Sequence, residues 1–389
     1  MSRSSAASEA DLLMAAKSTW IPAIRREHAL ATGVVAMGRR VTFVERPSDI
    51  RAIRPGNLRD FAVGLCAQRK STDMGPNLSV QARNVLLPAH RGKVAEYLDG
   101  QGLARALRAE SPDAALVVTT PWQWAAGRVA GQRRRVADFG DDWSTLIPRA
   151  AASVRRWHEM IAAEADEVIV ASPGLMDSFP GRSPRLIRNA TDDALIESPT
   201  TAPPRQNRMV YVGTLSERFD APLLARVLDE LPEWQLDLWG PCQYAGHGDQ
   251  PGPELRDLLA RGPDRVRWHG PAPRKDLARI LDTGDVLVLP NRPSATVGQD
   301  SMKAYDYSAR GRPLVSTELP ELAVRPPLLA ERSDVGGWVD ALVAASGELD
   351  DEAVTAERST VRRDWASRNT WSTRVPEWWA AVNGTAAPS

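Results

Sequence analysis

The stretch that decides the fold reads Asp285-Val-Leu-Val-Leu-Pro290, then a polar loop, then Gln299-Asp-Ser-Met-Lys-Ala-Tyr-Asp-Tyr307. Its apolar run is typical of a buried strand. The residues after the loop are typical of a helix, and this helix ends before the next strand. Asp300 is expected to cap this helix, and Gly311 to stand just past its end. In such a unit the helix begins at the carboxyl edge of the sheet, where its N–H groups favour a diphosphate.

Short apolar runs alternate with longer helix-period stretches along the rest of the chain, which predicts an α/β fold with parallel sheets. In the first half, strands are expected at Leu12–Lys17, Val41–Glu45, Ala114–Thr119, Arg135–Phe139 and Glu167–Ala171, with Val85–Leu87 as a candidate for one more. The helices expected between them are Ile24–Met37, Gly92–Glu110, Ala150–Ala165 and Pro173–Phe179. In the second half, the expected strands are Met209–Val212, Gln235–Trp239, Val266–Trp268, Val286–Pro290 and Pro313–Ser316. The expected helices there are Ala221–Leu231, Glu254–Arg261, Lys275–Asp282 and Ser301–Arg310.

The chain of 389 residues is longer than one hydrophobic core usually serves, so two domains are expected. A polar, proline-rich stretch with no apolar period, between Asn189 and Arg208, separates the two alternations. We therefore predict a first domain over residues 1–190, a linker over 191–207 and a second domain over 208–335. Residues 336–389 contain helical patterns and no strand, and such a tail can cross back onto the first domain.

Composition excludes several classes of protein. The 49 basic and 49 acidic residues balance, so nucleic acid is not an expected partner. Cys66 and Cys242 lie far apart without any metal-ligand spacing, so no metal site is expected. Neither a secretion signal nor a membrane-spanning run is found, which favours a cytoplasmic protein. No nucleotide-binding P-loop, dinucleotide fingerprint or G-x-S-x-G motif is present.

The helix after the deciding strand carries Lys303, Asp306, Tyr307 and Arg310 on one face, at positions i, i+3, i+4 and i+7. One interpretation is a solvated face with a Lys–Asp pair that contributes about 0.2–0.5 kcal/mol. The other is a ligand site, in which Lys303 neutralises phosphate charge and Asp306 accepts hydrogen bonds from ribose hydroxyls.

Several motifs give the chain a family resemblance. Met302-Lys-Ala-Tyr-Asp-Tyr307 and Gly311-Arg-Pro-Leu-Val-Ser-Thr317 resemble the "M-K-x-Y-E-Y…G-x-P-V-V-x-T" segment of group 1 (family 4-like) glycosyltransferases. The stretches Trp20–Pro47, Asp138–Trp143 and Asn189–Asp192 resemble further segments of the same family, in the same order. Within this family the segments resemble teichuronic-acid-type envelope enzymes and, more distantly, the xanthan glucuronosyltransferase.

The resemblance implies a GT-B fold, in which two Rossmann-like domains with parallel sheets face each other across a cleft. It also implies a nucleotide-sugar donor, with UDP as the first choice, and no other cofactor. The donor site would include Gly213, Thr214, His269, Gly270, Met302, Lys303, Asp306 and Tyr307. Gly213 would admit the phosphates, although it is also typical of a simple turn. Lys303 would contact the diphosphate, and Asp306 the ribose, where the family usually has the longer Glu.

Candidate catalytic residues lie in the first half. Asp141 and Asp142 follow a predicted strand, and either carboxylate would serve as the base that takes a proton from the acceptor hydroxyl. Asp141 is the first choice and Asp142 the second, and the alternative interpretation is a helix N-cap before Trp143. His28 is a further candidate, and a structural role for it is as well supported.

Two surface features suggest how an acceptor would bind. Four tryptophans in predicted loops, Trp20, Trp122, Trp124 and Trp143, are candidates for a platform that stacks on sugar rings. The run Arg133–Arg135 with Arg128 would suit an anionic lipid carrier or membrane surface, although a solvated charged face is the commoner outcome.

The predicted function is metal-independent transfer of a sugar from a nucleotide sugar, preferably UDP-linked, to a hydroxyl acceptor. The acceptor would be carbohydrate, lipid-linked or a small molecule, in cell-envelope polysaccharide or glycolipid biosynthesis or in secondary metabolism. Peripheral contact with the inner face of the membrane is a further expectation. A nucleotide-sugar 2-epimerase of the same architecture and a catalytically silent homologue remain alternatives.

Overall fold

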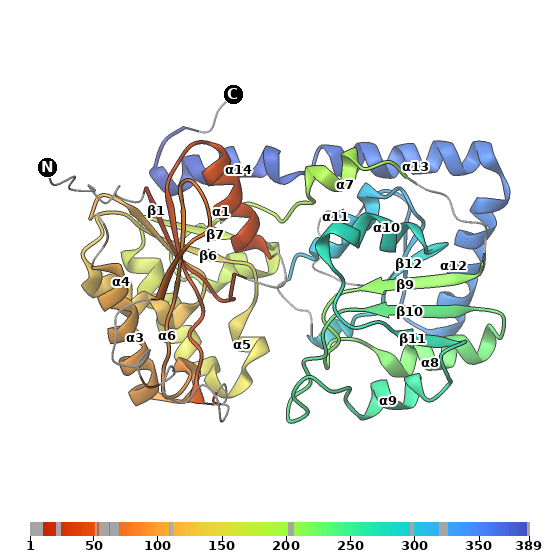
Figure 1. The fold of residues 1–389 in the computed structure, drawn as a ribbon, viewed down its shortest axis with the longest axis horizontal. Helices are drawn as coiled ribbons and strands as arrows, with labels where there is room; N and C mark the ends of the chain where they lie inside the picture. Colours follow the sequence, from red (N-terminus) through yellow and green to blue (C-terminus); the bar gives the residue numbers. More distant parts are fainter. Residues whose placement is uncertain are drawn as a thin grey trace, which may run out of the picture. The chain divides into compact units, whose positions relative to one another are not determined.

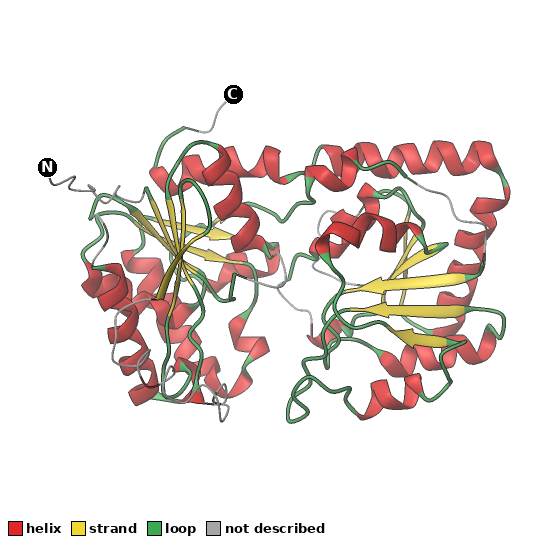
Figure 2. Cartoon of the chain, viewed as in Figure 1, coloured by secondary structure: helices red, strands yellow, loops and turns green. Residues whose placement is uncertain are grey.

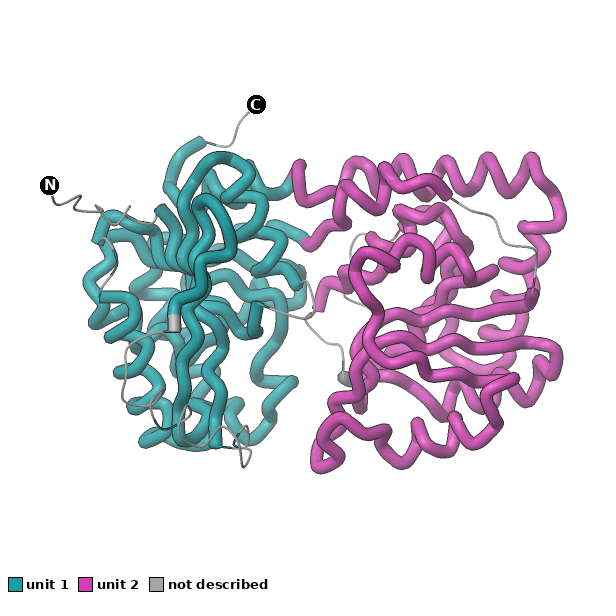
Figure 3. The backbone as a smooth tube through the Cα atoms, in the orientation of Figure 1, with its two compact units in different colours: residues 1–188, 374–389 teal, residues 189–373 magenta. Residues whose placement is uncertain are grey.

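The computed structural model describes residues 11–20, 25–50, 53, 62, 70–108, 110, 112–200, 206–295, 299–318 and 326–386. Cys66, the start of the expected helix at Ile24, and linker residues 201–205 lie outside the described residues. The chain divides into two compact units (Figure 3): unit 1 is residues 1–188 with 374–389, and unit 2 is residues 189–373. Each unit is described separately below.

Unit 1 is built on an eight-stranded sheet with the strand order β3-β4-β2-β1-β5-β6-β7-β8 (Figure 1). The strands are β1 Leu12–Ala15, β2 Val41–Val44, β3 Lys70–Asp73, β4 Leu78–Ala82, β5 Ala115–Val118, β6 Arg135–Phe139, β7 Glu167–Val170 and β8 Arg185–Leu186. All pairs are parallel except β3 with β4. The central strands β1, β2 and β5 are buried along their whole length, as expected for a sheet covered on both faces.

Helices cover both faces of this sheet. They are α1 Arg26–Ala36, α3 Lys93–Leu107, α4 Trp124–Ala130, α5 Trp143–Leu146, α6 Ala151–Glu164 and the end of α14 Trp371–Asn383. Leu103 of α3, Trp124 of α4 and Ile161 of α6 pack in one core with alternate residues of the central strands. Gly33 of α1 lies directly against Val375 of α14, which leaves no room for a side chain at position 33.

Unit 2 contains a six-stranded sheet, all parallel, with the order β11-β10-β9-β12-β13-β14. The strands are β9 Arg208–Val212, β10 Gln235–Trp239, β11 Val266–Trp268, β12 Val286–Leu289, β13 Leu314–Thr317 and β14 Leu329–Arg332. From β9 the chain adds β10 and β11 on one side of the sheet, and from β12 it adds β13 and β14 on the other side. This pair therefore forms the topological switch point, outside whose carboxyl ends open α/β sheets bind ligands.

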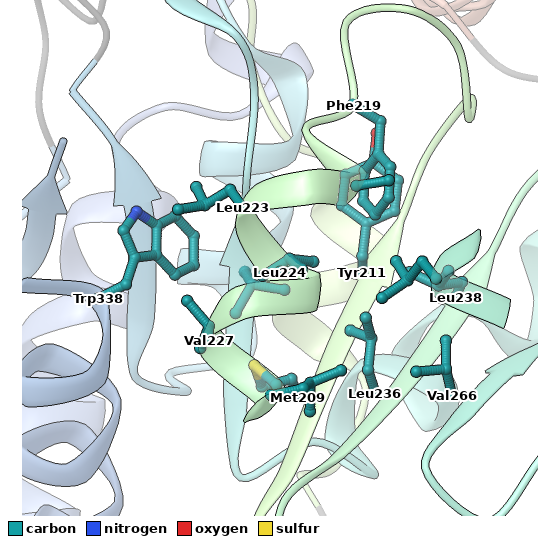
Figure 4. Close-up of a cluster of buried hydrophobic side chains, with 14 of the residues drawn as sticks. Met209, Tyr211, Phe219, Leu223, Leu224, Val227, Leu236, Leu238, Val266 and Trp338 are labelled. Atoms are coloured by element: carbon teal, nitrogen blue, oxygen red, sulfur yellow. The ribbon is translucent and has the colours of Figure 1, made fainter. Parts of the chain in front are cut away.

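Two helical layers enclose this sheet (Figure 2). The helices of unit 2 are α7 Asp193–Glu197, α8 Ala221–Glu230, α9 Pro253–Leu259, α10 Leu277–Asp282, α11 Met302–Ala309, α12 Val335–Gly347 and α13 Glu352–Ser367. Figure 4 shows one layer, in which Met209 and Tyr211 of β9 meet Leu224 and Val227 of α8 and Trp338 of α12. On the other face, the alternate strand residues Val210 and Leu287 pack against α10 and α11. Both units are therefore Rossmann-like.

Most predicted strands and helices are present within one or two residues of the predicted bounds, but several details were wrong. Val85–Leu87 is not a strand, and β3, β4, β8 and β14 were not predicted. Pro173–Ser178 is a 3-10 helix. The tail after Val335 forms helices α12, α13 and α14, as predicted.

Part of the expected linker packs within unit 2. Residues Asp193–Glu197 form helix α7, and Arg310 holds the chain that follows. The Arg310 guanidinium is buried, pairs with Asp282 at 2.7 Å, and donates to the carbonyls of Ser198 and Pro199 at 3.0 and 2.8 Å. A buried charge is tolerated when it is paired and hydrogen-bonded, so this contact fixes residues that look like free linker in the sequence.

The predicted cap of α11 was also wrong. Ser301 is the N-cap residue, and its side chain makes no capping hydrogen bond. The Asp300 carboxylate instead accepts from the Asn189 amide at 2.7 Å and from the Tyr305 hydroxyl at 3.0 Å. Gly311 follows the helix in the left-handed region, φ +68°, as predicted. Among the described residues, no helix is both long and apolar enough to cross a membrane.

Candidate functional site

The carboxyl edge of the unit 2 sheet brings together a glycine and the lysine of the deciding helix. Gly213 directly follows β9, and a Cβ at this position would overlap Cε of Lys303 and lie 3.1 Å from its Nζ. The Lys303 ammonium is also 5.6 Å from the centroid of the Tyr211 ring, within the range of a cation–π contact. A cation, a glycine and a helix N-terminus without a side-chain cap therefore meet at the topological switch point. Such a group suits a phosphate.

The backbone next to Lys303 is held from two sides. The Tyr211 hydroxyl donates to the carbonyl of Thr214 at 3.1 Å, and the Gly213 amide donates to the carbonyl of Trp239 at 2.8 Å. Gly240 adopts φ +139°, and a side chain there would overlap the Gly213 carbonyl. At Gly240 the two loops thus pack backbone against backbone, which only glycine permits there.

The predicted donor-site residues His269 and Gly270 follow β11, at the same edge of the sheet. The His269 ring stacks on Trp239 with centroids 4.1 Å apart and an interplanar angle of 4°. Its Nε2 lies 2.8 Å from the Asp237 carboxylate, which fixes the ring in place. Gly270, at φ +77°, accepts a hydrogen bond from the Gly240 amide at 2.7 Å. His269 and Gly270 therefore share the edge with Gly213, beside a flat aromatic pair.

Asp306 lies one turn after Lys303 on α11 and is partly buried. Burial raises the pKa of Asp306 to about 6, although the Thr191 hydroxyl and the charges of Arg274 and Lys303 oppose this shift. Thr191 Oγ1 donates to the carboxylate at 2.8 Å. The Thr191 amide in turn donates to the carbonyl of Asn369 at 3.0 Å. The expected ribose ligand is therefore bound to the chain that leads into α7.

Tyr307 has a different environment from the one predicted. Its hydroxyl accepts from the Val212 amide at 2.8 Å and lies 3.3 Å from the Val212 carbonyl, which anchors α11 to the end of β9. Tyr307 and Arg310 are each only 1% exposed, so the solvated-face interpretation is wrong for these two residues. Met302 is half-buried at the first position of α11.

In unit 1, Asp141 follows β6 and forms an ion pair with Lys17, which follows β1. Burial alone would lower the pKa of Lys17, but the carboxylates of Asp141 and Glu27 reverse this effect and raise the pKa. Sequence reasoning did not assign Lys17 to the site. Its position directly after a buried strand, in a chain with few lysines, was the available signal.

Asp142 is a helix cap. Its Oδ1 accepts from the Ser144 amide at 2.8 Å and hydroxyl at 2.6 Å, and its Oδ2 accepts from the Thr145 hydroxyl at 2.8 Å. Burial alone would raise the pKa of Asp142, but these hydrogen bonds lower it. Both oxygens of Asp142 are therefore committed to its own helix, so the geometry favours the N-cap interpretation.

His28 is also fully engaged. Its Nδ1 accepts from the Arg25 amide at 2.9 Å, and its Nε2 lies 2.8 Å from the carbonyl of Thr19, to which it donates. The ring stacks on Phe43, and burial lowers the pKa of His28. The imidazole is therefore neutral, with both nitrogens committed, as expected for a structural histidine.

Trp124 cannot contribute to an acceptor platform. Its side chain is completely buried, and its indole nitrogen donates to Glu164 at 3.1 Å. Trp20 packs edge-on against Phe43. Trp122 and Trp143 lie together, with ring centroids 5.0 Å apart, and both remain partly exposed. Burial therefore excludes Trp124, and the neighbouring pair Trp122 and Trp143 is the candidate for a stacking surface.

The arginine run does not form an open basic patch. Arg128 pairs with Glu164 at 3.0 Å, and Arg133 pairs with Asp113 at 2.8 Å. Arg134 donates to the Ala381 carbonyl at 2.9 Å, and Arg135 lies over the ring of Trp124. The anionic-surface interpretation therefore has little support at this run, because its charges are already partnered within unit 1.

No group of three or more His, Cys, Asp or Glu side chains in the described part of the chain is placed to hold a metal ion.

Solved structures with different sequences share this fold. Sucrose-phosphate synthase from Thermosynechococcus elongatus has a TM-score of 0.70 at 18% identity, with 95% of this chain and 96% of that chain covered. Anabaena HepE, in complex with UDP and glucose, has a TM-score of 0.66 at 15% identity, with 95% and 99% covered. A trehalose-6-phosphate synthase, OtsA, has a TM-score of 0.72 at 12% identity, with 97% and 100% covered. Identities this low show the fold alone, which is GT-B.

The comparison with family models matches only part of the chain. Residues 206–347, in unit 2, match the family model described as glycosyl transferases group 1. No curated protein has significant sequence similarity to the chain. The matched residues include Gly213, Lys303 and Asp306, so the family domain contains the edge described above. The domain match and the GT-B fold together support glycosyl transfer as the reaction.

Proposed function

We propose that this protein transfers a sugar from a UDP-linked donor to a hydroxyl acceptor without a metal ion. The observation that carries the proposal is the packing of Lys303 against Gly213 at the switch point of unit 2. A neighbour of the same fold, Anabaena HepE, is known in complex with UDP and glucose. By the family resemblance, the acceptor belongs to cell-envelope polysaccharide or glycolipid biosynthesis, with a secondary metabolite as the second choice.

Unit 2 would hold the leaving group. The diphosphate would lie at the N-terminus of α11, where Lys303 and the first N–H groups of the helix stabilise the charge that develops as UDP departs. A side chain at position 213 would overlap the end of Lys303 and displace it. Asp306 would accept from the ribose, and the stacked pair His269 and Trp239 would border the base.

Unit 1 would hold the acceptor. If the transfer inverts the anomeric configuration, the acceptor oxygen attacks the anomeric carbon, the bond to UDP breaks, and a carboxylate takes the hydroxyl proton. Asp141 is the proposed base, because Asp142 is committed to its helix cap. Lys17 would orient the Asp141 carboxylate through their ion pair. Trp122 and Trp143 would stack on the acceptor sugar.

The test is Lys303→Ala, with Lys275→Ala as its matched control, since Lys275 is exposed on a 3-10 helix of the same unit. Calorimetric titration would compare UDP with UMP. We expect wild type and Lys275→Ala to bind UDP more tightly than UMP, and Lys303→Ala to lose roughly tenfold or more in affinity for UDP alone. Unchanged UDP binding by a folded Lys303→Ala protein would contradict the proposed site.

Product analysis separates the proposed reaction from its alternatives. Incubation with UDP-sugars and EDTA should give slow hydrolysis, or transfer when an acceptor is supplied. An epimerised nucleotide sugar formed without acceptor would instead identify an epimerase. Absence of both UDP binding and hydrolysis would favour a silent homologue.

A further inference from the structure

Helix α3 of unit 1 exposes an apolar surface at its N-terminal end. Val94, Tyr97 and Leu98 are 74%, 64% and 51% exposed, and their spacing of i, i+3 and i+4 places them on one face. The loop just before the helix also exposes Leu86 and Leu87, at 53% and 48%. Single exposed apolar residues are common, but five within thirteen positions form a patch that requires an explanation.

Within the described residues, the exposed charges on the same side of α3 are positive. Arg91 and Lys93 flank the start of the helix, and Arg105 lies three turns beyond Val94 on the same side. All three residues are exposed, and within the described part of the chain none of them forms an ion pair. We call Val94, Tyr97 and Leu98, with Arg91, Lys93 and Arg105, the α3 face.

The acidic residues of α3 point away from this face. Glu96 accepts from Arg156 and from Ser153, both at 2.9 Å. Asp99 is buried and paired with Arg83. Both carboxylates therefore contact other side chains within unit 1, and the α3 face presents apolar side chains and cations with no opposing charge.

We infer that the α3 face docks on an anionic lipid surface. A helix that lies in a membrane interface inserts its apolar side chains at the level of the headgroups, while Lys and Arg contact anionic lipids. Tyr97 suits this depth, because an aromatic ring with a polar hydroxyl favours the interface. The pairing of Arg128 and Arg133–Arg135 leaves the α3 face as the better candidate for such contact.

A second copy of the chain fits this surface less well. In a symmetric dimer the same patch meets itself, so Arg91, Lys93 and Arg105 would face the like charges of the partner copy. The α3 face offers no exposed carboxylate to relieve that repulsion. Anionic phospholipid supplies the missing negative charge.

The experiment is flotation of the full chain with vesicles of phosphatidylcholine that contain about 30 mol% phosphatidylglycerol, against vesicles of pure phosphatidylcholine. We expect binding to the anionic vesicles only, weakening as salt is raised. The triple variant Val94→Ser, Tyr97→Ser, Leu98→Ser should bind roughly tenfold more weakly or worse. The triple variant Arg91→Gln, Lys93→Gln, Arg105→Gln should lose roughly fivefold for each charge removed.

Matched controls change equal numbers of exposed residues elsewhere. The apolar control is Met37→Ser, Val343→Ser, Val361→Ser, and the charge control is Arg149→Gln, Arg226→Gln, Arg267→Gln. Both controls should float like wild type, and all variants should keep their melting temperature and UDP affinity. Failure of wild type to float, equal flotation of the α3 variants, or self-association that the apolar triple variant abolishes would overturn the inference. UDP titration reports on the proposed function separately.

Discussion

Polar residues lie at the strand ends of both sheets, but their bonding differs. In unit 1 the charged residues at the strand ends satisfy one another, since Arg26 holds Asp138, Lys17 holds Asp141, and Asp142 caps its own helix. In unit 2 the end of the Lys303 side chain packs directly on Gly213, where a Cβ would overlap it. The buried pair of Arg26 with Asp138 and the cap made by Asp142 stabilise the fold, whereas a lysine packed on a glycine at the switch point of a sheet suits a phosphate.

The largest expected effect is a loss of stability, and it tests whether the Arg26–Asp138 pair of unit 1 is structural. The Arg26 guanidinium is buried and makes hydrogen bonds of 3.0–3.1 Å with both oxygens of Asp138, which also accepts from Trp378. Arg26→Ala leaves a buried carboxylate unpaired, so unfolding in urea should show a loss of about 3–5 kcal/mol. The exposed pair of Arg40 with Asp11 is the control, and Arg40→Ala should cost less than about 1 kcal/mol. Equal costs for the two variants would show that the unit 1 cluster is not structural.

The second prediction tests whether the Gly213 edge of unit 2 binds the ligand. Gly213→Ala introduces a methyl group that must displace the end of the Lys303 side chain, which is flexible. We expect roughly 100-fold weaker UDP binding by calorimetry, about 2.7 kcal/mol, with a melting temperature close to that of wild type. Gly347→Ala is the control, because no atom lies within 4 Å of the added methyl group. A Gly213→Ala protein that binds UDP normally would mean that Gly213 only forms a turn.

Much of the fold could be predicted because its signals are local. The buried strands of both units are short apolar runs, and their period separates them from the helices. Strand β3 could not be predicted, because Lys70-Ser-Thr-Asp73 is polar throughout and pairs only with β4 at the sheet edge. The packing of residues 193–199 into unit 2 depends on Arg310, more than 100 positions away, and no local pattern encodes that contact.

Some features of the candidate site could likewise be predicted from local motifs, and others could not. The group 1 motif located Lys303 and Gly213, whose juxtaposition the structure shows. It could not reveal that Tyr307 bonds to the backbone of β9, since a tyrosine on a motif helix serves equally as ligand or anchor. The pairing of Lys17 with Asp141 joins two strand ends 124 positions apart. Such a contact follows from sheet order and not from spacing.

The third prediction separates the two neighbouring carboxylates of unit 1. Asp142→Ala removes the cap of α5 and should destabilise the protein by about 1–2 kcal/mol. Asp142→Asn keeps an acceptor oxygen, so it should retain most of the stability and the turnover. Sugar transfer measured alongside thermal melting distinguishes these outcomes. A stable Asp142→Asn protein with transfer reduced roughly 100-fold would instead give Asp142 the role proposed for Asp141.

The smallest expected effect concerns Asp306, whose pKa is raised by burial to about 6 in the folded chain from its ordinary value of 3.8. The folded state therefore binds more protons than the unfolded state between about pH 4 and 6, and stability falls as pH rises through that window. Above pH 6 the cost of holding a charged, partly buried carboxylate remains.

Asp306→Asn removes that cost while preserving an oxygen that accepts from Thr191. The variant should match wild type near pH 4 and exceed its unfolding free energy by about 1 kcal/mol at pH 8. Because other carboxyls titrate in the same range, the difference between the two proteins is the quantity to measure. If the charge serves the donor, the same variant should bind UDP-glucose more weakly above pH 6 despite its higher stability. A more stable protein with unchanged donor affinity would assign Asp306 to the packing of α11 and remove it from the ribose site.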